Sequence, residues 1–192
     1  PNTPGLRDMQ TPQILAEILS AVKTGLDRAD LPILIKLAPD MAEDDFFAVL
    51  DRLPDLGVAG VILTNTTIQR PDHLTSPHKT ESGGLSGRPL LEASTAWLSR
   101  AYQRLGGKVM LIGVGGIVSA EAAYAKILAG ANLIQLYTAL ALQGPDLPSR
   151  IIAGLDQLLA RDGYRHLNDA VGQAKDPAEA LAASGWTAKQ NR

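Results

Sequence analysis

Strand and helix signals alternate regularly along this chain, and that alternation constrains the fold more than any other feature. Four short apolar runs lie at residues 33–38, 59–65, 109–114 and 132–138, with amphipathic helical segments between them. Such alternation predicts an α/β fold with a parallel sheet and right-handed crossovers. An open doubly wound sheet and a (β/α)8 barrel both fit. A barrel usually takes eight strands and about 250 residues, so a barrel would make this chain a carboxyl-terminal half.

Two further features favour an incomplete sheet. Four apolar parallel strands on their own would leave two open edges, which promote aggregation. The chain also begins at Pro1 rather than at a methionine. We therefore expect an amino-terminal part, or a partner copy, to complete the sheet.

Capping residues and glycines mark the expected helix boundaries. Thr11 followed by Pro12 predicts a helix start. Asp40 and Glu43 have the spacing of a capping box, and Ser119 is placed to cap the helix after the third strand. Later helices are expected at about 90–104 and 146–161, and residues 173–192 are expected to form a peripheral or mobile tail.

The composition is that of an ordinary soluble globular protein and excludes several functions. The chain has 192 residues, of which 45% are hydrophobic and 20% charged, with a net charge of −2. Nothing in this balance favours nucleic acid, and no apolar run approaches the roughly 20 residues needed to cross a bilayer. The chain contains no cysteine and only three histidines, which argues against a thiolate or histidine metal site.

Polar side chains stand at the carboxyl ends of the predicted strands. Residues 61–67, Val-Ile-Leu-Thr-Asn-Thr-Thr, are an apolar strand that ends in four hydrogen-bonding side chains. Buried strands of a parallel sheet have little reason to carry amides and hydroxyls unless that end opens into a binding site. The runs at 111–116 and 134–138 end similarly, and Lys36 lies among apolar neighbours near the end of the first strand. One shared binding rim is therefore expected.

The glycine-rich turn at residues 113–116 lies between a strand and the helix capped by Ser119. Such a turn lets backbone N–H groups approach a phosphate. The alternative is a tight turn that merely needs positive φ. The polar end of the next strand, at Leu136, Tyr137 and Thr138, favours the phosphate, because barrel phosphate sites are often built from the loops after the last two strands.

The side chains of the first two strands suggest a planar, electron-accepting ligand. Lys36 is predicted to be a fixed cation beside a ring or carboxylate, and the alternative is a lysine that extends to water at the rim. Thr64, Asn65 and Thr66 offer both donors and acceptors to an amide-rich ligand. In the alternative interpretation, these three residues only cap the end of the strand and form a turn. The long loop at 68–88 has the length of a lid or ligand clamp.

Six segments in the right order together resemble class 2, quinone-linked dihydroorotate dehydrogenase. They are residues 1–7, 35–40, 64–67, 83–87, 113–116 and 135–138. The resemblance covers about residues 1–172, and the Thr-Asn-Thr-Thr strand end favours class 2 over class 1. It implies an FMN-binding (β/α)8 barrel in which this chain supplies strands five to eight.

The resemblance also implies roles for individual residues. Contacts with the orotate ring and its carboxylate are implied for Asn2, Thr3, Asn65 and Thr66. Contacts with the flavin ring are implied for Lys36 and Thr64, with Lys36 placed to stabilise reduced flavin, and Ser86 and Gly87 would line its outer side. The FMN phosphate would be bound by Gly115, Gly116, Leu136, Tyr137 and Thr138.

The implied reaction is oxidation of dihydroorotate to orotate in de novo pyrimidine biosynthesis. A proton would leave C5, a hydride would pass from C6 to flavin N5, and a quinone would be the final electron acceptor. The family's serine base would fall one residue before Pro1. Quinone and peripheral contact with the inner membrane, on its cytoplasmic side in a bacterium, would involve the amino-terminal part, whereas this chain itself is expected to be soluble.

Three other functions are compatible with parts of the pattern. Another flavin barrel, acting on a pyrimidine or a dihydrouridine, would keep the phosphate loops but need a different substrate strand. A non-catalytic half-barrel that binds FMN or phosphate is a second alternative. A flavin-free sugar-phosphate isomerase barrel is the third, and a bound yellow chromophore would exclude it.

Overall fold

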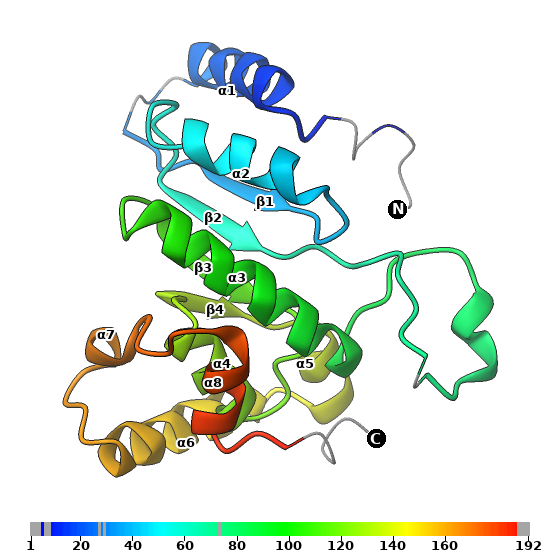
Figure 1. Cartoon of the computed structure of the whole chain (residues 1–192), viewed down its shortest axis with the longest axis vertical. Coiled ribbons are helices and arrows are strands. Elements are labelled where there is room, and N and C mark those ends of the chain that lie inside the picture. Colours follow the sequence, from blue (N-terminus) through cyan, green and yellow to red (C-terminus); the bar gives the residue numbers. More distant parts are fainter. Residues whose placement is uncertain (1–4, 6–8, 27, 29, 73, 188–192) are drawn as a thin grey trace.

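A computed structural model describes residues 5, 9–26, 28, 30–72 and 74–187. Its four strands are β1 (Leu34–Leu37), β2 (Gly60–Leu63), β3 (Met110–Val114) and β4 (Leu133–Gln135). They form one parallel sheet in the order β1-β2-β3-β4 (Figure 1). A doubly wound sheet reverses its strand order at a switch point. Because each new strand here is added on the same side, the order is that of a barrel segment.

Helices and short turns connect the strands, and several begin or end where the sequence predicts. The hydroxyl of Thr11 accepts from the N–H of Ile14 at 3.3 Å, and that of Ser119 from Ala122 at 3.3 Å. The helices are α1 (Pro12–Gly25), α2 (Glu43–Arg52), α3 (Leu91–Leu105), α4 (Ala120–Leu128), α5 (Thr138–Gln143), α6 (Leu147–Arg161), α7 (Leu167–Ala170) and α8 (Pro177–Ala183), with 3-10 turns η1 (Pro77–Thr80) and η2 (Arg88–Leu90).

The predicted capping box at the start of α2 is wrong. The N-cap residue is Ala42, which makes no side-chain hydrogen bond. Asp40 instead accepts from the hydroxyl of Thr67 and from the N–H of Ile68, the latter at 3.1 Å. The carboxylate therefore joins the ends of β1 and β2, because the neighbouring strand presents donors that local spacing does not reveal.

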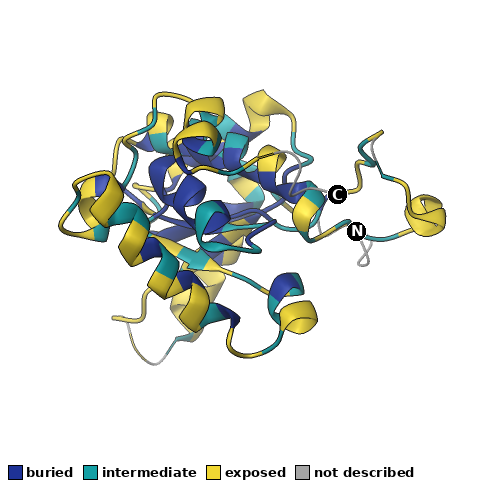
Figure 2. Ribbon diagram, turned by 90° about the horizontal axis from the view of Figure 1, so that it is seen from below, coloured by how far each residue is buried: buried dark blue, intermediate teal, exposed yellow. Residues whose placement is uncertain are grey.

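The hydrophobic core lies between one face of the sheet and the helices that cover it (Figure 2). Leu37, Val61 and Leu63 point into it and are fully buried, as is Phe46 of α2. The ring of Phe46 meets that of Trp97 edge to face at 4.6 Å between centroids. Each fully buried aliphatic side chain contributes about 1.5–3 kcal/mol to stability, so this layer holds the strands in register.

The opposite face of the sheet is uncovered in the described part of the chain. Leu34, Met110 and Leu133 are 43%, 44% and 54% exposed, and Leu34 and Met110 lie in one row across β1, β2 and β3. Parallel sheets are normally covered on both faces. The exposed row and the open edges at β1 and β4 agree with the expectation that further structure completes this sheet.

The middle of the expected tail forms a helix, α8, that is attached to the rest of the fold. In this segment α8 packs on α3 and α4, with Ala180 and Ser184 fully buried. The N–H of Ala174 donates to the carbonyl of Leu128 at 3.1 Å. Residues 174–184 therefore lie near the end of the chain but are held against α3 and α4 by these contacts. Residues 188–192 lie outside the described residues.

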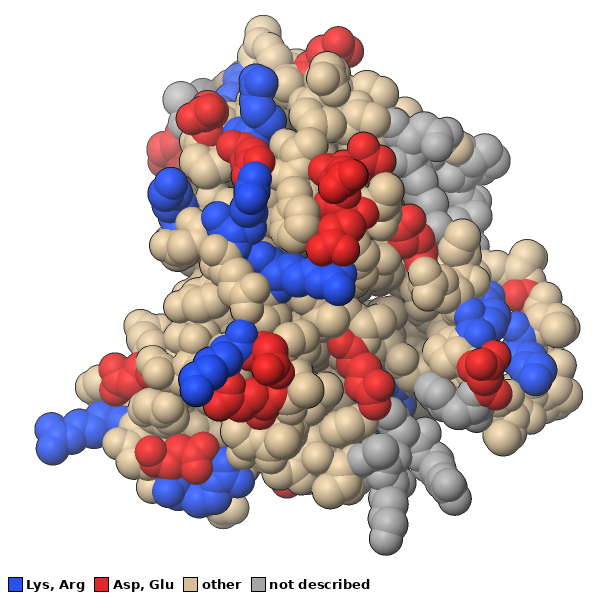
Figure 3. Space-filling view, in the orientation of Figure 1, with Lys and Arg blue, Asp and Glu red and all other residues tan. Residues whose placement is uncertain are grey.

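Charges of both signs are interspersed on the face seen in Figure 3, with no extended basic area. Among the helices of the described ranges, none has the length and apolar character of a membrane span.

Candidate functional site

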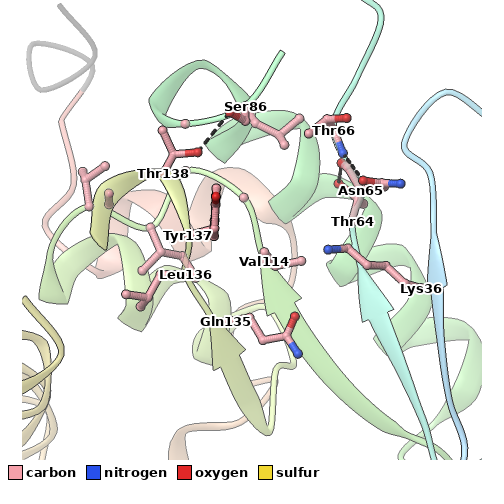
Figure 4. A pocket seen from close by; sticks show the side chains of 17 residues that line it. Lys36, Thr64, Asn65, Thr66, Ser86, Val114, Gln135, Leu136, Tyr137 and Thr138 are labelled. Atoms are coloured by element: carbon pink, nitrogen blue, oxygen red, sulfur yellow. Dashed lines mark hydrogen bonds between the residues drawn. The ribbon is translucent and has the colours of Figure 1, made fainter. Parts of the chain in front are cut away.

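A pocket lies where the carboxyl ends of all four strands meet (Figure 4). β1 contributes Lys36, and the segments after β2, β3 and β4 supply most of the rest, with part of the long loop as one wall. Its lining residues are Lys36, Thr64, Asn65, Thr66, Ser86, Gly87, Leu90, Val114, Gly115, Gly116, Ile117, Val118, Gln135, Leu136, Tyr137, Thr138 and Ala139. Ligands of parallel α/β folds bind at this end of the strands.

Every predicted site residue in the described part of the chain lines this one pocket. The predicted flavin and phosphate residues lie on three of its sides, and Asn65 and Thr66 form part of the rim beyond β2 (Figure 4). Asn2 and Thr3 lie outside the described residues. The structure therefore brings the candidates together, and their individual roles remain predictions.

The end of β2 orients its polar side chains through local hydrogen bonds. The peptide bond between Leu63 and Thr64 is cis. Thr64 is buried, and its hydroxyl donates to the carbonyl of Asn65 at 2.9 Å. The side-chain oxygen of Asn65 accepts from the N–H of Thr66 at 2.9 Å. This bond orients the amide of Asn65. Its NH2 group has no partner among the described residues and can donate to a ligand.

Thr67 anchors the long loop rather than lining the pocket. Its hydroxyl binds Asp40, and its backbone pairs with Leu85 in both directions, at 2.7 and 3.2 Å. These contacts close the base of the loop. The four-residue polar run thus divides into residues that face the pocket and one that supports the fold.

The glycine turn after β3 combines tight packing with exposed donors. Gly115 and Gly116 have φ values of +110° and +76°, and a Cβ on Gly116 would lie 2.4 Å from the Cβ of Leu91. Glycine is thus required by the backbone and by packing, as in the alternative of a tight turn. The backbone N–H groups of Gly115, Gly116 and Tyr137 nevertheless have no hydrogen-bond acceptor within the described part, so the turn also presents donors to a ligand.

The end of the long loop meets the start of α5. The hydroxyl of Thr138 donates to that of Ser86 at 3.0 Å (Figure 4). A Cβ on Gly87 would lie 3.3 Å from Cγ2 of Thr138. Ser86 and Gly87 therefore close the pocket on the side of β4, where the hydroxyl groups of Ser86 and Thr138 lie together.

Lys36 is exposed at the rim rather than buried in the sheet. The strand alternates, so Ile35 and Leu37 face the helices while Lys36 lies on the uncovered face. Within the described ranges its amine has no hydrogen-bond or ion-pair partner, and the side chain extends toward the middle of the pocket (Figure 4). The structure thus supplies an unpaired cation at this position.

Arg70 holds the projecting part of the loop together. Its guanidinium donates to six backbone carbonyls at 2.9–3.3 Å, those of Thr67, Ile68, Gln69, Lys79, Glu81 and Gly83. His78 lies 2.8 Å from Glu81. In the described part of the chain no three His, Cys, Asp or Glu residues gather as a metal site would require.

Replacing Arg70 with lysine is expected to speed proteolytic cleavage within residues 68–84 by roughly tenfold. A lysine cannot reproduce the fork of donors, and losing charge-assisted hydrogen bonds of about 1.5 kcal/mol or more raises the open population by that order. Timed limited proteolysis with mass spectrometry measures the rate of cleavage. Arg104→Lys is the control, because Arg104 pairs with Asp51 away from the loop. Equal cleavage rates in both variants would contradict this role.

Sequence reasoning missed six of the lining residues. Of these, Gln135 carried a signal, because it is a polar residue near the end of an apolar strand. The other five are apolar or small and look like ordinary core residues in the sequence. They are Leu90, Val114, Ile117, Val118 and Ala139.

A family model and the curated relatives of this chain point to the same protein family. The family model described as dihydroorotate dehydrogenase matches residues 1–159. The dihydroorotate dehydrogenase (quinone) of Deinococcus deserti is 49% identical over 90% of this chain and 49% of its own length. That of Thermobifida fusca is 47% identical over 93% and 49%. The chain thus spans about half the length of the curated relatives it matches.

Solved structures agree with this assignment. The dihydroorotate dehydrogenase of Eimeria tenella in complex with ferulenol matches with a TM-score of 0.83 and 35% identity, over 90% of this chain and 51% of that one. Its ligand-free form gives 0.84 and 36%. The α/β prediction is confirmed, since the parallel sheet matches half of these barrel structures. The chain belongs to the dihydroorotate dehydrogenase family, on the quinone-linked side of that family.

Proposed function

We propose that this chain forms the flavin- and orotate-binding half of a quinone-linked dihydroorotate dehydrogenase, with residues 1–172 as the half-barrel. One observation carries the proposal: all the candidate residues in the described part line a single pocket at the carboxyl ends of the strands. The family assignment supports the same activity. The reaction is oxidation of dihydroorotate to orotate with a quinone as final acceptor.

The chemistry of the pocket fits FMN. The unpaired N–H groups of Gly115, Gly116 and Tyr137 suit the acceptor oxygens of a phosphate. Tyr137 is 82% exposed, and its side chain is among those that line the pocket (Figure 4). The hydroxyls of Ser86 and Thr138 add donors beside this cradle. Lys36, across the pocket, suits a ring that gains negative charge.

When bound, FMN would accept a hydride from the substrate and pass electrons on to a quinone. The chain's own contribution is to bind and orient. Lys36 and Thr64 would lie against the ring, and Lys36 would stabilise negative charge as it develops. The described lining residues include no carboxylate, imidazole or thiol, so the proton acceptor for C5 is expected outside this set.

The end of β2 is the proposed substrate-binding segment. Asn65, with its amide oriented by Thr66, offers an N–H donor to a pyrimidine carbonyl or carboxylate. Thr66 adds a hydroxyl. A site built from such polar groups discriminates against ligands that leave them unpaired, which favours orotate over a sugar phosphate.

The visible absorption spectrum of the purified protein, followed by anaerobic addition of dihydroorotate, tests the proposal. Bleaching of a flavin band would establish the activity in the sample. A band that persists on dihydroorotate but bleaches with another pyrimidine or a dihydrouridine would identify a different flavin barrel. A protein that neither contains nor takes up FMN would overturn the proposal.

Asn65→Ala is expected to weaken orotate binding about tenfold or more while FMN stays bound. The variant loses one or two hydrogen bonds to the ligand, and such bonds are worth about 1.5–3 kcal/mol when a charged group takes part. Orotate titration of the flavin spectrum measures the affinity. Asn168→Ala on α7 removes a remote, exposed amide and serves as control. Unchanged orotate affinity in Asn65→Ala would remove this residue from the substrate site.

A further inference from the structure

A buried lysine lies directly behind the glycine turn of the pocket. Lys126, on α4, is fully buried, and it does not line the pocket itself. Its Nζ donates to the hydroxyl of Ser94 at 2.5 Å and to the carbonyl of Leu91 at 3.3 Å. Lysines are almost never fully buried unless paired with a charge, and no carboxylate pairs with this one in the described part of the chain.

The contacts of this amine suit a neutral hydrogen-bond donor. An ammonium offers three N–H donors, whereas a neutral amine offers two, and the described residues supply two acceptors. Burial lowers the pKa of the Lys126 amine well below its ordinary value. The amine can therefore stay buried without a counter-ion, and its effect on its neighbours is through hydrogen bonds.

Ser94 connects the amine to both walls of the pocket. Its hydroxyl lies 2.6 Å from the carbonyl of Leu90, which lines the wall formed by η2. It also lies 3.2 Å from the carbonyl of Gly115, in the wall that follows β3. The carbonyl of Leu91 also lies 3.2 Å away. A serine hydroxyl has one hydrogen to donate, so the bond accepted from Lys126 leaves that hydrogen to be shared among these three carbonyls.

The glycine turn, the start of α3 and Lys126 are packed against one another without free space. A Cβ on Gly115 would lie 2.8 Å from Oγ of Ser94, and one on Gly113 would lie 3.1 Å from Cβ of Lys126. Both distances are shorter than ordinary contacts between carbon and its neighbours. The turn, the first turn of α3 and Lys126 are therefore in direct contact, and moving one displaces the others.

We propose that Lys126 is a positioning residue for the phosphate-binding turn. Through Ser94 and Leu91 it holds residues 113–116 against the start of α3, which keeps the N–H groups of Gly115 and Gly116 directed at the phosphate. The inference rests on the proposed flavin site and adds to it a residue that touches no ligand. Loss of this support should therefore weaken recognition of the phosphate in particular.

The test compares FMN with riboflavin, which lacks the phosphate, in the protein as purified. Lys126→Met and Ser94→Ala should each lower FMN affinity about tenfold, the order that loss of a supporting residue has at metal sites, and leave riboflavin affinity unchanged. Tyr124→Phe is the matched control. It lies on the same helix, is equally buried, and loses a bond to Asp162 at 2.8 Å on the side of α6.

The possible results separate this inference from the proposed function. Equal weakening of FMN and riboflavin in Lys126→Met, Ser94→Ala and Tyr124→Phe would reduce Lys126 to a general packing residue and overturn the inference. A wild-type protein that does not prefer FMN to riboflavin would overturn the proposed phosphate site instead. In that case, amide hydrogen exchange of the unliganded protein decides. Faster exchange at 113–118 in Ser94→Ala, but not in Tyr124→Phe, supports the inference, and equal exchange overturns it.

Discussion

Replacing Lys36 with alanine should slow flavin reduction by dihydroorotate about a hundredfold or more. Lys36 is the single charged side chain among the described residues that line the pocket. Removing one group that stabilises developing negative charge typically lowers a rate by about 10²–10³. The side chain is exposed and without a described partner, so the free energy of unfolding should change by no more than about 0.5 kcal/mol.

Stopped-flow absorbance after anaerobic mixing measures the reduction rate, and chemical denaturation measures the stability. Lys108→Ala is the matched control, because Lys108 is an exposed lysine in the turn before β3, outside the pocket lining. Lys36→Ala with wild-type reduction kinetics would refute the assigned role. A variant that is slow only because it holds less FMN would show Lys36 to be a binding contact rather than a stabiliser of charge.

Replacing Gly116 with alanine is expected to destabilise the fold by about 3 kcal/mol or more. The residue has φ +76°, a conformation that costs an L-residue about 1–2 kcal/mol. The new Cβ would also lie 2.4 Å from Cβ and 2.6 Å from Cα of Leu91. Overpacking adds about 1–3 kcal/mol. The turn must move away from α3, so FMN affinity should fall as well.

The Gly107→Ala variant separates the cost of the positive φ from the cost of the contact with Leu91. Gly107 has a similar φ of +79°, but a Cβ there meets nothing within 4 Å. The Gly107→Ala protein should therefore lose only about 1–2 kcal/mol of folding free energy and keep its FMN affinity. Equal denaturation midpoints for the two variants would mean that contact with Leu91 contributes nothing. A stable Gly116→Ala protein with normal FMN affinity would argue against the turn as the phosphate site.

Much of the site could be predicted because its signals are local. Val61 and Leu63 alternate toward the core, and polar residues begin where β2 leaves it. In a parallel sheet all carboxyl ends reach the same edge, so polar residues that end four strands must meet. The pocket lies at this edge, and of the predicted site residues only Asn2 and Thr3 lie outside the described residues.

Other features depend on contacts between segments far apart in the chain. Asp40 and Glu43 have capping-box spacing, yet Asp40 binds Thr67 instead because β2 lies beside it. Residues 177–183 are alanine-rich and weakly patterned, yet they form α8 on the surface of α3 and α4. In each case the partner is more than twenty residues away, so no local pattern could identify it.

The sequence by itself determined the α/β class, the four strands and the rim at which their polar ends meet, because burial and backbone periodicity act over a few residues. Only the tertiary structure decided the sheet order that distinguishes a barrel segment from a doubly wound sheet. It also decided which lysine is exposed and which is buried. Lys36 faces the pocket and Lys126 lies behind it, because exposure depends on which distant segments pack against each side chain.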